Sequence, residues 1–231
     1  VGSDGTAGMP SSEVNATSSS FTCTAVNSCS SLASGSIYVD NGTLSGIYDD
    51  YHIYAHYYPG FDNSTGCVSN SNFTSGKGPI GTQSLIIQNV ITSSTSFATK
   101  SVFYSDTGCS SEISSMVTGY NEVSVGDNVT GLTTSVGNST YPSHASKVTY
   151  KESCSEIKGT TDVGTAYLNN LLSTSWVTTG ETYTCQGSGR TTYALVAYDN
   201  SSVFWERLHS ETSSTAYPTD WSSNTDSATK L

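Results

Sequence analysis

Residues 85–104 read LIIQNVITSSTSFATKSVFY. The segment holds two runs, Leu85 to Ile91 and Phe97 to Tyr104, each about as long as a typical strand. Both runs are rich in β-branched and aromatic residues, which favour the pleated surface of a sheet. Because side chains alternate between the two faces of a strand, Phe97 and Phe103 are expected on one face. The stretch therefore predicts two β-strands.

Runs of the same kind recur on both sides of this segment and are bounded by Asn-Gly and Pro-Gly turn signals. Roughly nine short strands without an internal repeat predict an all-β protein with a single antiparallel sheet. We expect a curled sheet or a lipocalin-like barrel, because closure removes edges that a weakly charged chain could not protect with Lys. Beyond 85–104, the expected strands are 37–40, 44–49, 51–58, 114–123, 147–157, 181–185, 191–198 and 203–208.

One segment departs from the strand pattern. Val163, Tyr167 and Leu171 fall at helical spacing, so we predict one short helix over 162–172 with Asp162 at its N-cap. The predicted organisation is an irregular, disulfide-stapled arm over 1–35, a barrel domain over 36–209 and a polar tail over 210–231. Within the barrel, 126–146 is expected to be a long polar loop.

The composition limits the classes of partner. The net charge is −11, and Ser and Thr make up a third of the 231 residues. Because such an acidic chain is repelled by phosphate groups, we expect neither nucleic acid nor an anionic membrane surface as a partner. The 15 Tyr residues argue against disorder. The longest apolar runs are too short to span a membrane.

The six cysteines indicate a disulfide framework. They permit 15 pairings, and we favour Cys23–Cys29, Cys67–Cys109 and Cys154–Cys185, because neighbours in sequence tend to be neighbours in an up-and-down sheet. Such a framework forms in an oxidising compartment. The sequence from Val1 onward shows no charged and apolar signal-peptide pattern. We therefore expect a mature, secreted, extracellular protein. The cysteines are Cys23, Cys29, Cys67, Cys109, Cys154 and Cys185.

Seven Asn-x-Ser/Thr sequons support the same compartment. Most of them lie in Gly-, Ser- and Asp-rich stretches, where surface loops are expected, so we predict N-linked glycans on at least four, with Asn63, Asn72, Asn128 and Asn138 favoured by their long loops. The sequons are at Asn15, Asn41, Asn63, Asn72, Asn128, Asn138 and Asn200.

The chain shows no pattern typical of catalysis or metal binding. His52 and His56 lie about 13 Å apart if they share one strand face, which is too far for one ion. Asp49 and Asp50 could take part in acid–base chemistry, but an exposed acidic turn is the simpler interpretation. The sequence contains no nucleophile elbow, zinc-protease or phosphate-loop motif. We expect no enzyme activity and no metal.

Aromatic side chains are the informative class. Each one could be ordinary core, but together they suit an apolar cavity, since wider barrels enclose ligands. The main hypothesis is a barrel that binds a hydrophobic small molecule, such as a lipid, carotenoid or sterol. The alternative is a structural or coat glycoprotein with a solid barrel that assembles with itself or with other extracellular proteins. The candidate ligand-binding residues are Tyr48, Tyr54, Phe97, Phe103, Tyr120, Tyr150, Trp176, Tyr193 and Trp205.

Part of the chain resembles a known family. Residues 102–109 contain a Tyr-x-Asp-x-x-Cys strand motif, and 147–150 lead to a helix ending in Leu168-Asn169. Trp176, Gly180 and Cys185 follow, and then Phe204-Trp205 and Tyr217-Pro218-Thr219. This order over about 85–231 resembles the APCDD family of extracellular Wnt-pathway regulators. The Arg-rich segments common in that family are missing. The resemblance implies a lipocalin-like barrel that can hold an acyl chain or a similar hydrophobic ligand.

Overall fold

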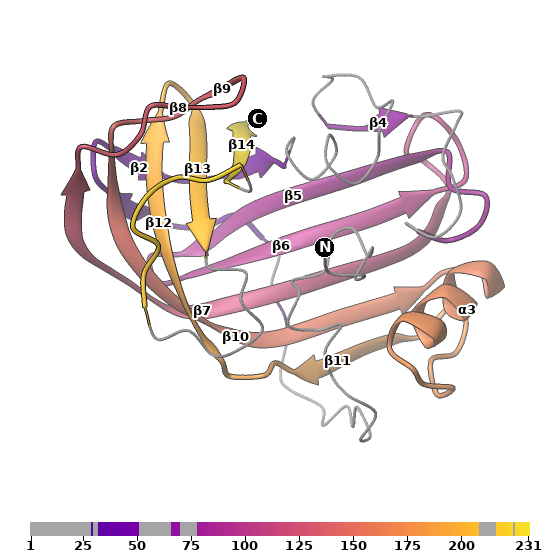
Figure 1. Ribbon diagram of the computed structural model, residues 1–231. Coiled ribbons are helices and arrows are strands. Elements are labelled where there is room, and N and C mark those ends of the chain that lie inside the picture. The colour runs from indigo at the N-terminus through magenta and orange to yellow at the C-terminus, as the bar shows by residue number, and fades with distance from the viewer. Residues whose placement is uncertain (1–28, 30–31, 51–65, 70–77, 208–215, 224) are drawn as a thin grey trace.

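The computed structural model describes residues 29, 32–50, 66–69, 78–207, 216–223 and 225–231. Over these residues it confirms an all-β fold with one short helix, α3 (Asp162–Leu171) (Figure 1). The strands are β1 (Ile37–Val39), β2 (Gly42–Leu44), β3 (Ile47–Asp49), β4 (Val68–Ser69), β5 (Ser84–Ser93), β6 (Ser96–Tyr104), β7 (Glu112–Thr130), β8 (Ser135–Val136), β9 (Ser139–Thr140), β10 (His144–Gly159), β11 (Thr182–Gln186), β12 (Thr191–Asp199), β13 (Ser202–Arg207) and β14 (Asp226–Lys230).

Eight strands close into an antiparallel barrel. Their order is β10-β12-β13-β14-β3-β5-β6-β7, and the pairing of β7 with β10 completes the ring. The long β7–β10 ladder has three register shifts, the first between Ser146 and Val148. Irregularities of this kind bend a strand and increase its twist, which a sheet needs in order to curl on itself.

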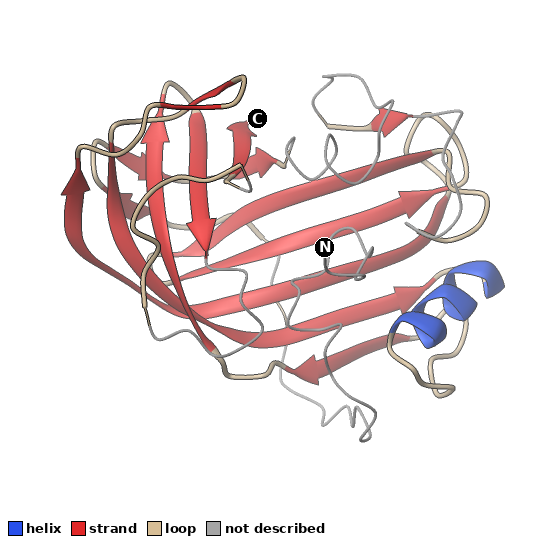
Figure 2. Ribbon diagram, viewed as in Figure 1, coloured by secondary structure: helices blue, strands red, loops and turns tan. Residues whose placement is uncertain are grey.

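The barrel is closed over only part of the length of its longest strands. The first half of β10 pairs with β12, whereas its second half, from Cys154 to Lys158, pairs with β11. Figure 2 shows that α3 lies at the far end of the extended sheet formed by β5, β6, β7, β10 and β11. There Leu168 of α3 packs against Met116 and Ile157. The helix therefore covers the open end of the sheet and not the closed barrel.

Strand β12 is buried on both of its faces. Ala194 and Val196 belong to the core inside the barrel, while Leu195 and Ala197 pack in a second core outside it. Trp221 covers this outer core, and its indole Nε1 donates a hydrogen bond to the Pro142 carbonyl at 2.7 Å. The uninterrupted apolar run of β12 is what burial on two faces requires.

Two predicted boundaries are wrong. Residues 126–146 are not one loop, since β7 runs to Thr130, β8 and β9 form a hairpin, and β10 begins at His144. The tail also contributes to the barrel, because β14 lies between β13 and β3. Both segments are polar because one face of each strand meets solvent, and polarity alone does not distinguish such a strand from a loop.

The predicted helix is confirmed, but its N-cap is Thr161 and not Asp162. Thr161 has an extended backbone, with φ −125° and ψ 165°, and its hydroxyl accepts a hydrogen bond from the Gly164 backbone N–H. Asp162 is the first helical residue, where its negative charge favours the positive end of the helix dipole.

One of the three predicted disulfides is confirmed and two are wrong. Cys67–Cys109 is present, but Cys29 bonds to Cys154 in place of Cys23. Cys185 is also disulfide-bonded, though not to Cys154. In the β10–β11 ladder Cys185 lies opposite Ser155, and Cys154 lies opposite Gln186. The two cysteines are therefore offset by one residue and point to opposite faces of the sheet.

Candidate ligand-binding cavity

The barrel contains a partly open cavity of about 120 Å³. Its walls come from strands that are distant in sequence and are brought together by barrel closure. The lining residues are Ile37, Val39, Leu44, Tyr48, Asp50, Asn89, Ile91, Phe97, Thr99, Tyr120, Val123, Val148, Tyr150, Val196, Val203, Trp205, Arg207 and Asp226. Eight of these side chains are aliphatic, so the cavity is mainly apolar.

Three aromatic rings form one wall. The rings of Phe97 and Tyr120 stack at 4.7 Å, and the edge of Tyr150 meets both of them, at 5.0 Å and 5.3 Å. Phe97 and Tyr120 face each other directly across the β6–β7 ladder. Such ring pairs contribute about 0.5–1.5 kcal/mol beyond the apolar area they bury. The three rings therefore support one another on this side of the cavity.

Tyr48 and Trp205 complete the aromatic lining. Tyr48 is only 1% exposed, and its hydroxyl accepts a hydrogen bond from the Ser45 backbone N–H at 3.2 Å. Burial raises the pKa of the Tyr48 hydroxyl, and the hydrogen bond from Ser45 opposes this effect. Tyr48 is therefore a neutral wall residue. Trp205 extends inward from β13 against the same core.

Polar side chains gather at one end of the cavity. Asp50 is 1% exposed and accepts a hydrogen bond from Asn89 Nδ2 at 2.9 Å. The Asn89 carbonyl oxygen in turn accepts one from Thr99 Oγ1, also at 2.9 Å. Arg207 donates to the buried Tyr150 hydroxyl, whose pKa is raised by burial. Asp50 is thus a buried cavity residue, and the expectation that it lies in an exposed turn is wrong.

The β1–β2 hairpin lines the opposite end of the cavity. Its inner side chains Ile37, Val39 and Leu44 contact the cavity, and the hairpin is a separate sheet with no strand pairing to the barrel. Gly42 lies so close to Tyr198 that an added Cβ would be 2.1 Å from that ring. This hairpin and the barrel are therefore held together by side chains.

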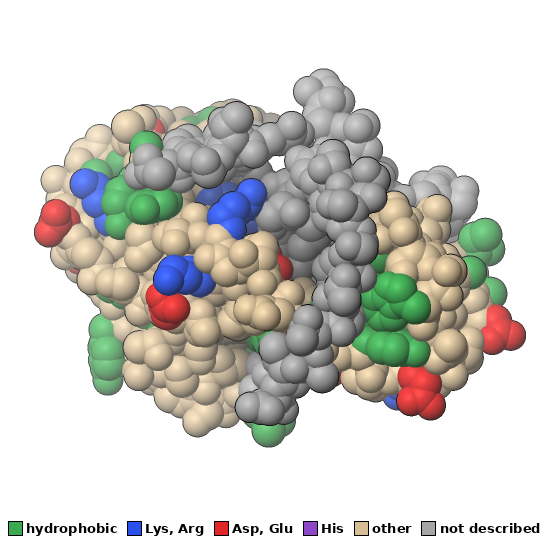
Figure 3. Space-filling view, turned by 90° about the horizontal axis from the view of Figure 1, so that it is seen from below, with side chains coloured by type: hydrophobic (Ala, Val, Ile, Leu, Met, Phe, Trp, Pro, Cys, Tyr) green, Lys and Arg blue, Asp and Glu red, His purple; other side chains and the backbone are tan. Residues whose placement is uncertain are grey.

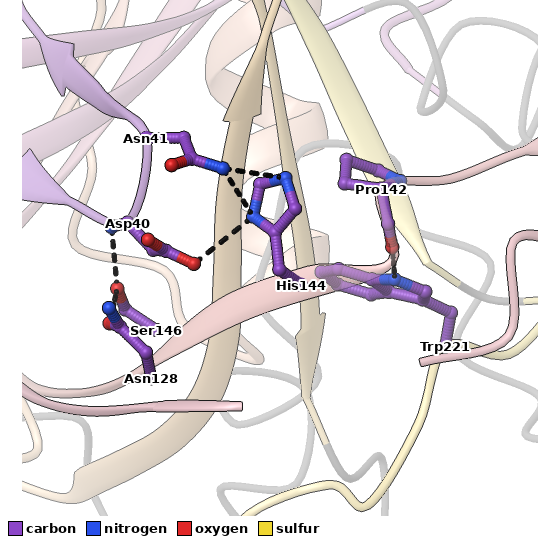
Figure 4. Close-up of polar contacts among 7 residues, drawn as sticks. All are labelled: Asp40, Asn41, Asn128, Pro142, His144, Ser146 and Trp221. Atoms are coloured by element: carbon purple, nitrogen blue, oxygen red, sulfur yellow. Dashed lines mark hydrogen bonds and ion pairs between the residues drawn. The ribbon is translucent and has the colours of Figure 1, made fainter. Parts of the chain in front are cut away.

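Hydrogen bonds tie the tip of the hairpin to the start of β10 (Figure 4). Asp40 Oδ2 lies 3.2 Å from His144 Nδ1, and Asn41 Nδ2 lies 2.9 Å from His144 Nε2. An imidazole protonated on Nδ1 satisfies both contacts, donating to Asp40 and accepting from Asn41. Ser146 Oγ accepts from the Asp40 backbone N–H at 2.7 Å and donates to Asn128 at 3.1 Å.

Of the nine predicted ligand-binding residues, five line the cavity: Tyr48, Phe97, Tyr120, Tyr150 and Trp205. Phe103 shares the inner face with Phe97, but six residues of strand place it about 20 Å away, where its ring meets Tyr167 of α3 at 5.8 Å. Trp176 packs on Tyr183 near the same helix. Both lie away from the cavity because the sheet extends beyond the closed barrel.

Tyr193 lies on the outside of the barrel. As predicted it shares a face with Leu195, but this is the outer face, where its ring meets Tyr217 at 5.2 Å. Tyr54, His52 and His56 lie outside the described residues. In the described part of the chain, no group of three or more His, Cys, Asp and Glu side chains could hold a metal ion.

Sequence reasoning missed the polar end of the cavity and the hairpin. Arg207 follows Val203 and Trp205 at alternate positions of one strand, and Asp50 follows Tyr48 in the same way. That alternation was the available signal, since residues two apart share a face. The contribution of the hairpin carried no comparable signal, because it depends on contacts with β10 and β12.

Comparison with known proteins adds no relative. No family model matches the chain, and no curated protein matches it. No helix in the described part of the chain is long and apolar enough to cross a bilayer.

Proposed function

We propose that this protein is an extracellular binding protein that holds a small, predominantly apolar molecule in its barrel and carries out no catalysis. The observation that carries the proposal is the cavity inside the barrel, with five aromatic and eight aliphatic lining residues. Burial in such a site stabilises a complex by about 25 cal/mol per Å² of apolar area removed from water, less the cost of immobilising the ligand.

The size of the cavity limits the occupant. Ligand pockets for drug-sized molecules start at roughly 300 Å³, and this cavity has about 120 Å³. A compact molecule, or one end of a longer chain, fits the cavity in its present shape. A whole lipid, carotenoid or sterol requires the β1–β2 hairpin or the aromatic wall to move.

Secretion and glycosylation form the second part of the proposal. Two disulfides suit an oxidising compartment. The sequon residues Asn41, Asn128, Asn138 and Asn200 are exposed, although Asn128 lies in β7 and not in the loop expected. The sequons at Asn15, Asn63 and Asn72 lie outside the described residues. Enzymatic deglycosylation of protein from its natural source should lower its mass. An unchanged mass would contradict the proposed glycosylation.

A structural role is the second candidate, favoured by two observations. The rings of Phe97, Tyr120 and Tyr150 pack directly against one another inside the barrel. The described surface in Figure 3 carries few, dispersed charged side chains and consists mostly of other polar side chains and backbone. A surface of this kind, bearing sugar, suits a coat or matrix component that assembles with copies or with other extracellular proteins.

Native mass spectrometry combined with organic extraction separates the two candidates. Protein from its natural source should release a bound apolar molecule. The matched variants are Val123→Phe, which fills the cavity, and Ser124→Phe, at the adjacent exposed position on the other face of β7. Loss of the molecule from the first variant alone supports the binding proposal, with circular dichroism showing that both are folded. A ligand-free native protein that binds no apolar probe supports the structural role.

A further inference from the structure

The polar and apolar parts of the cavity lie at different levels of the barrel. In the β5–β6 ladder Ile91 faces Phe97, and two residues along, Asn89 faces Thr99. On the opposite wall Val203 faces Ala228, and two residues along, Trp205 faces Asp226. The polar level thus occupies the end at which β3 reaches Asp50 and β13 reaches Arg207. The hairpin occupies the other end, so the cavity is amphipathic along its axis.

The polar end of the cavity has more acidic than basic side chains. Asp50 and Asp226 are 1% and 8% exposed, and Arg207 is the one cation among the described lining residues. Arg207 is already engaged by the Tyr150 hydroxyl, on which the charge of Asp226 also acts. A bound carboxylate would place three negative groups around one guanidinium in a medium of low dielectric constant, where like charges repel strongly.

Hydrogen-bonding capacity continues past the polar end. Ser101 is the next inward-facing residue of β6 after Thr99 and is 2% exposed. Its hydroxyl oxygen has no hydrogen-bond partner among the described residues. A buried hydroxyl without a partner costs about 1–3 kcal/mol, and this one lies on the face from which the polar level projects. Ser101 is not one of the residues that line the cavity, so it extends the polar character of this face beyond the cavity.

We propose that the cavity selects an apolar molecule whose polar end is a hydroxyl or an amine, and that it discriminates against a carboxylate. The inference rests on the proposed function and names the ligand class for that site. The hydroxyl or amine donates to the carboxylates or to Asn89 at the polar end, and the apolar part lies between the aromatic wall and the hairpin.

The test uses three probes of equal length that differ only in their polar end: 1-hexanol, hexylamine and hexanoate. Their affinities are measured by isothermal titration calorimetry on ligand-stripped full-length protein at pH 7.4. Hexanol and hexylamine should each bind about tenfold or more tightly than hexanoate. Asp50→Asn keeps an acceptor for Asn89 but removes one negative charge, so it should reduce the preference for hexylamine over hexanoate several-fold. Asp199→Asn, at the exposed β12–β13 turn, is the matched control and should leave that ratio unchanged.

The outcomes separate this inference from the proposed function. Hexanoate binding as tightly as hexanol, or more tightly, overturns the ligand class while the cavity remains a binding site. Failure of all three probes to bind, with no molecule released from native protein, overturns both. If the Asp50→Asn variant does not fold, Asp226→Asn is used in its place. The same reduction in the preference for hexylamine over hexanoate is expected for it.

Discussion

Gly119 leaves the space that the sulfur of Cys154 occupies. A Cβ atom added at position 119 would lie 2.5 Å from the Sγ atom of Cys154 and 2.9 Å from that of Cys29. Both atoms belong to the disulfide that fastens Cys29 to the outer face of β10, beside Ala98 and Val117. The glycine is therefore required by the disulfide, and not by the conformation of its own backbone.

Gly119→Ala should destabilise the protein by about 1–3 kcal/mol, the usual cost of overpacking a filled site. Gly126→Ala is the matched control in the same strand, because a Cβ there meets its nearest atom at an ordinary 3.6 Å. Chemical denaturation of both variants measures the difference. The loss should shrink in a Cys29→Ala/Cys154→Ala background, and an equal loss in that background would show that the disulfide is not its cause.

Removal of the Cys29–Cys154 disulfide should cost more stability than removal of Cys67–Cys109. The two bonds close chain segments of 125 and 42 residues. The chain-entropy relation predicts losses of about 5 and about 4 kcal/mol for the respective double Ala variants. Urea denaturation measures both losses. Peptide mapping of unreduced protein checks the pairing, and a Cys154–Cys185 peptide would contradict the structure.

His144→Ala should loosen the β1–β2 hairpin without unfolding the barrel. Replacement removes the contacts of the ring with Asp40 and Asn41, and a net hydrogen-bond contribution of about 1 kcal/mol corresponds to roughly fivefold faster amide exchange. Hydrogen exchange over 37–44 is the measurement. Ser143→Ala, an exposed neighbour, is the control. Unchanged exchange over the hairpin would mean that its apolar contacts alone hold it in place.

Asp106 should make the stability of its turn depend on pH. Desolvation by itself raises the pKa of this carboxyl, but hydrogen bonds from Ser111, Ser110 and Gly108 outweigh it and lower the pKa to about 2. Because the folded pKa lies below the ordinary 3.8, the ionised form stabilises the fold above that value, and the contribution is lost as pH falls toward 2.

Comparison of Asp106→Asn with the wild type in urea tests this dependence. The midpoint difference should be present at pH 5 and should diminish at pH 2. Asp199→Asn serves as the exposed control. A carboxyl of Asp106 that titrates near 3.8 by NMR would contradict the assigned hydrogen bonds.

Alternation along single strands made much of the fold predictable. The runs at 85–91 and 97–104 are strands β5 and β6, and the helical spacing of Val163, Tyr167 and Leu171 marks α3. These patterns are local, because a strand or helix buries one face at its own period whatever its neighbours are. Polar strands such as β14 were missed, since their burial pattern depends on partners far away in sequence.

The sequence by itself determined the class of fold, the shared face of Phe97 and Phe103, and that of Tyr193 and Leu195. Tertiary structure alone decided which face is the interior. Alternation along a strand shows that two residues share a face, but it does not show toward which face the barrel closes. It also decided the disulfides, because an offset of one residue between β10 and β11 turns Cys154 and Cys185 to opposite faces. The cavity depends on closure in the same way: Asp50 and Arg207 lie at one end and the hairpin at the other, and the wall between them is complete only because β7 pairs with β10.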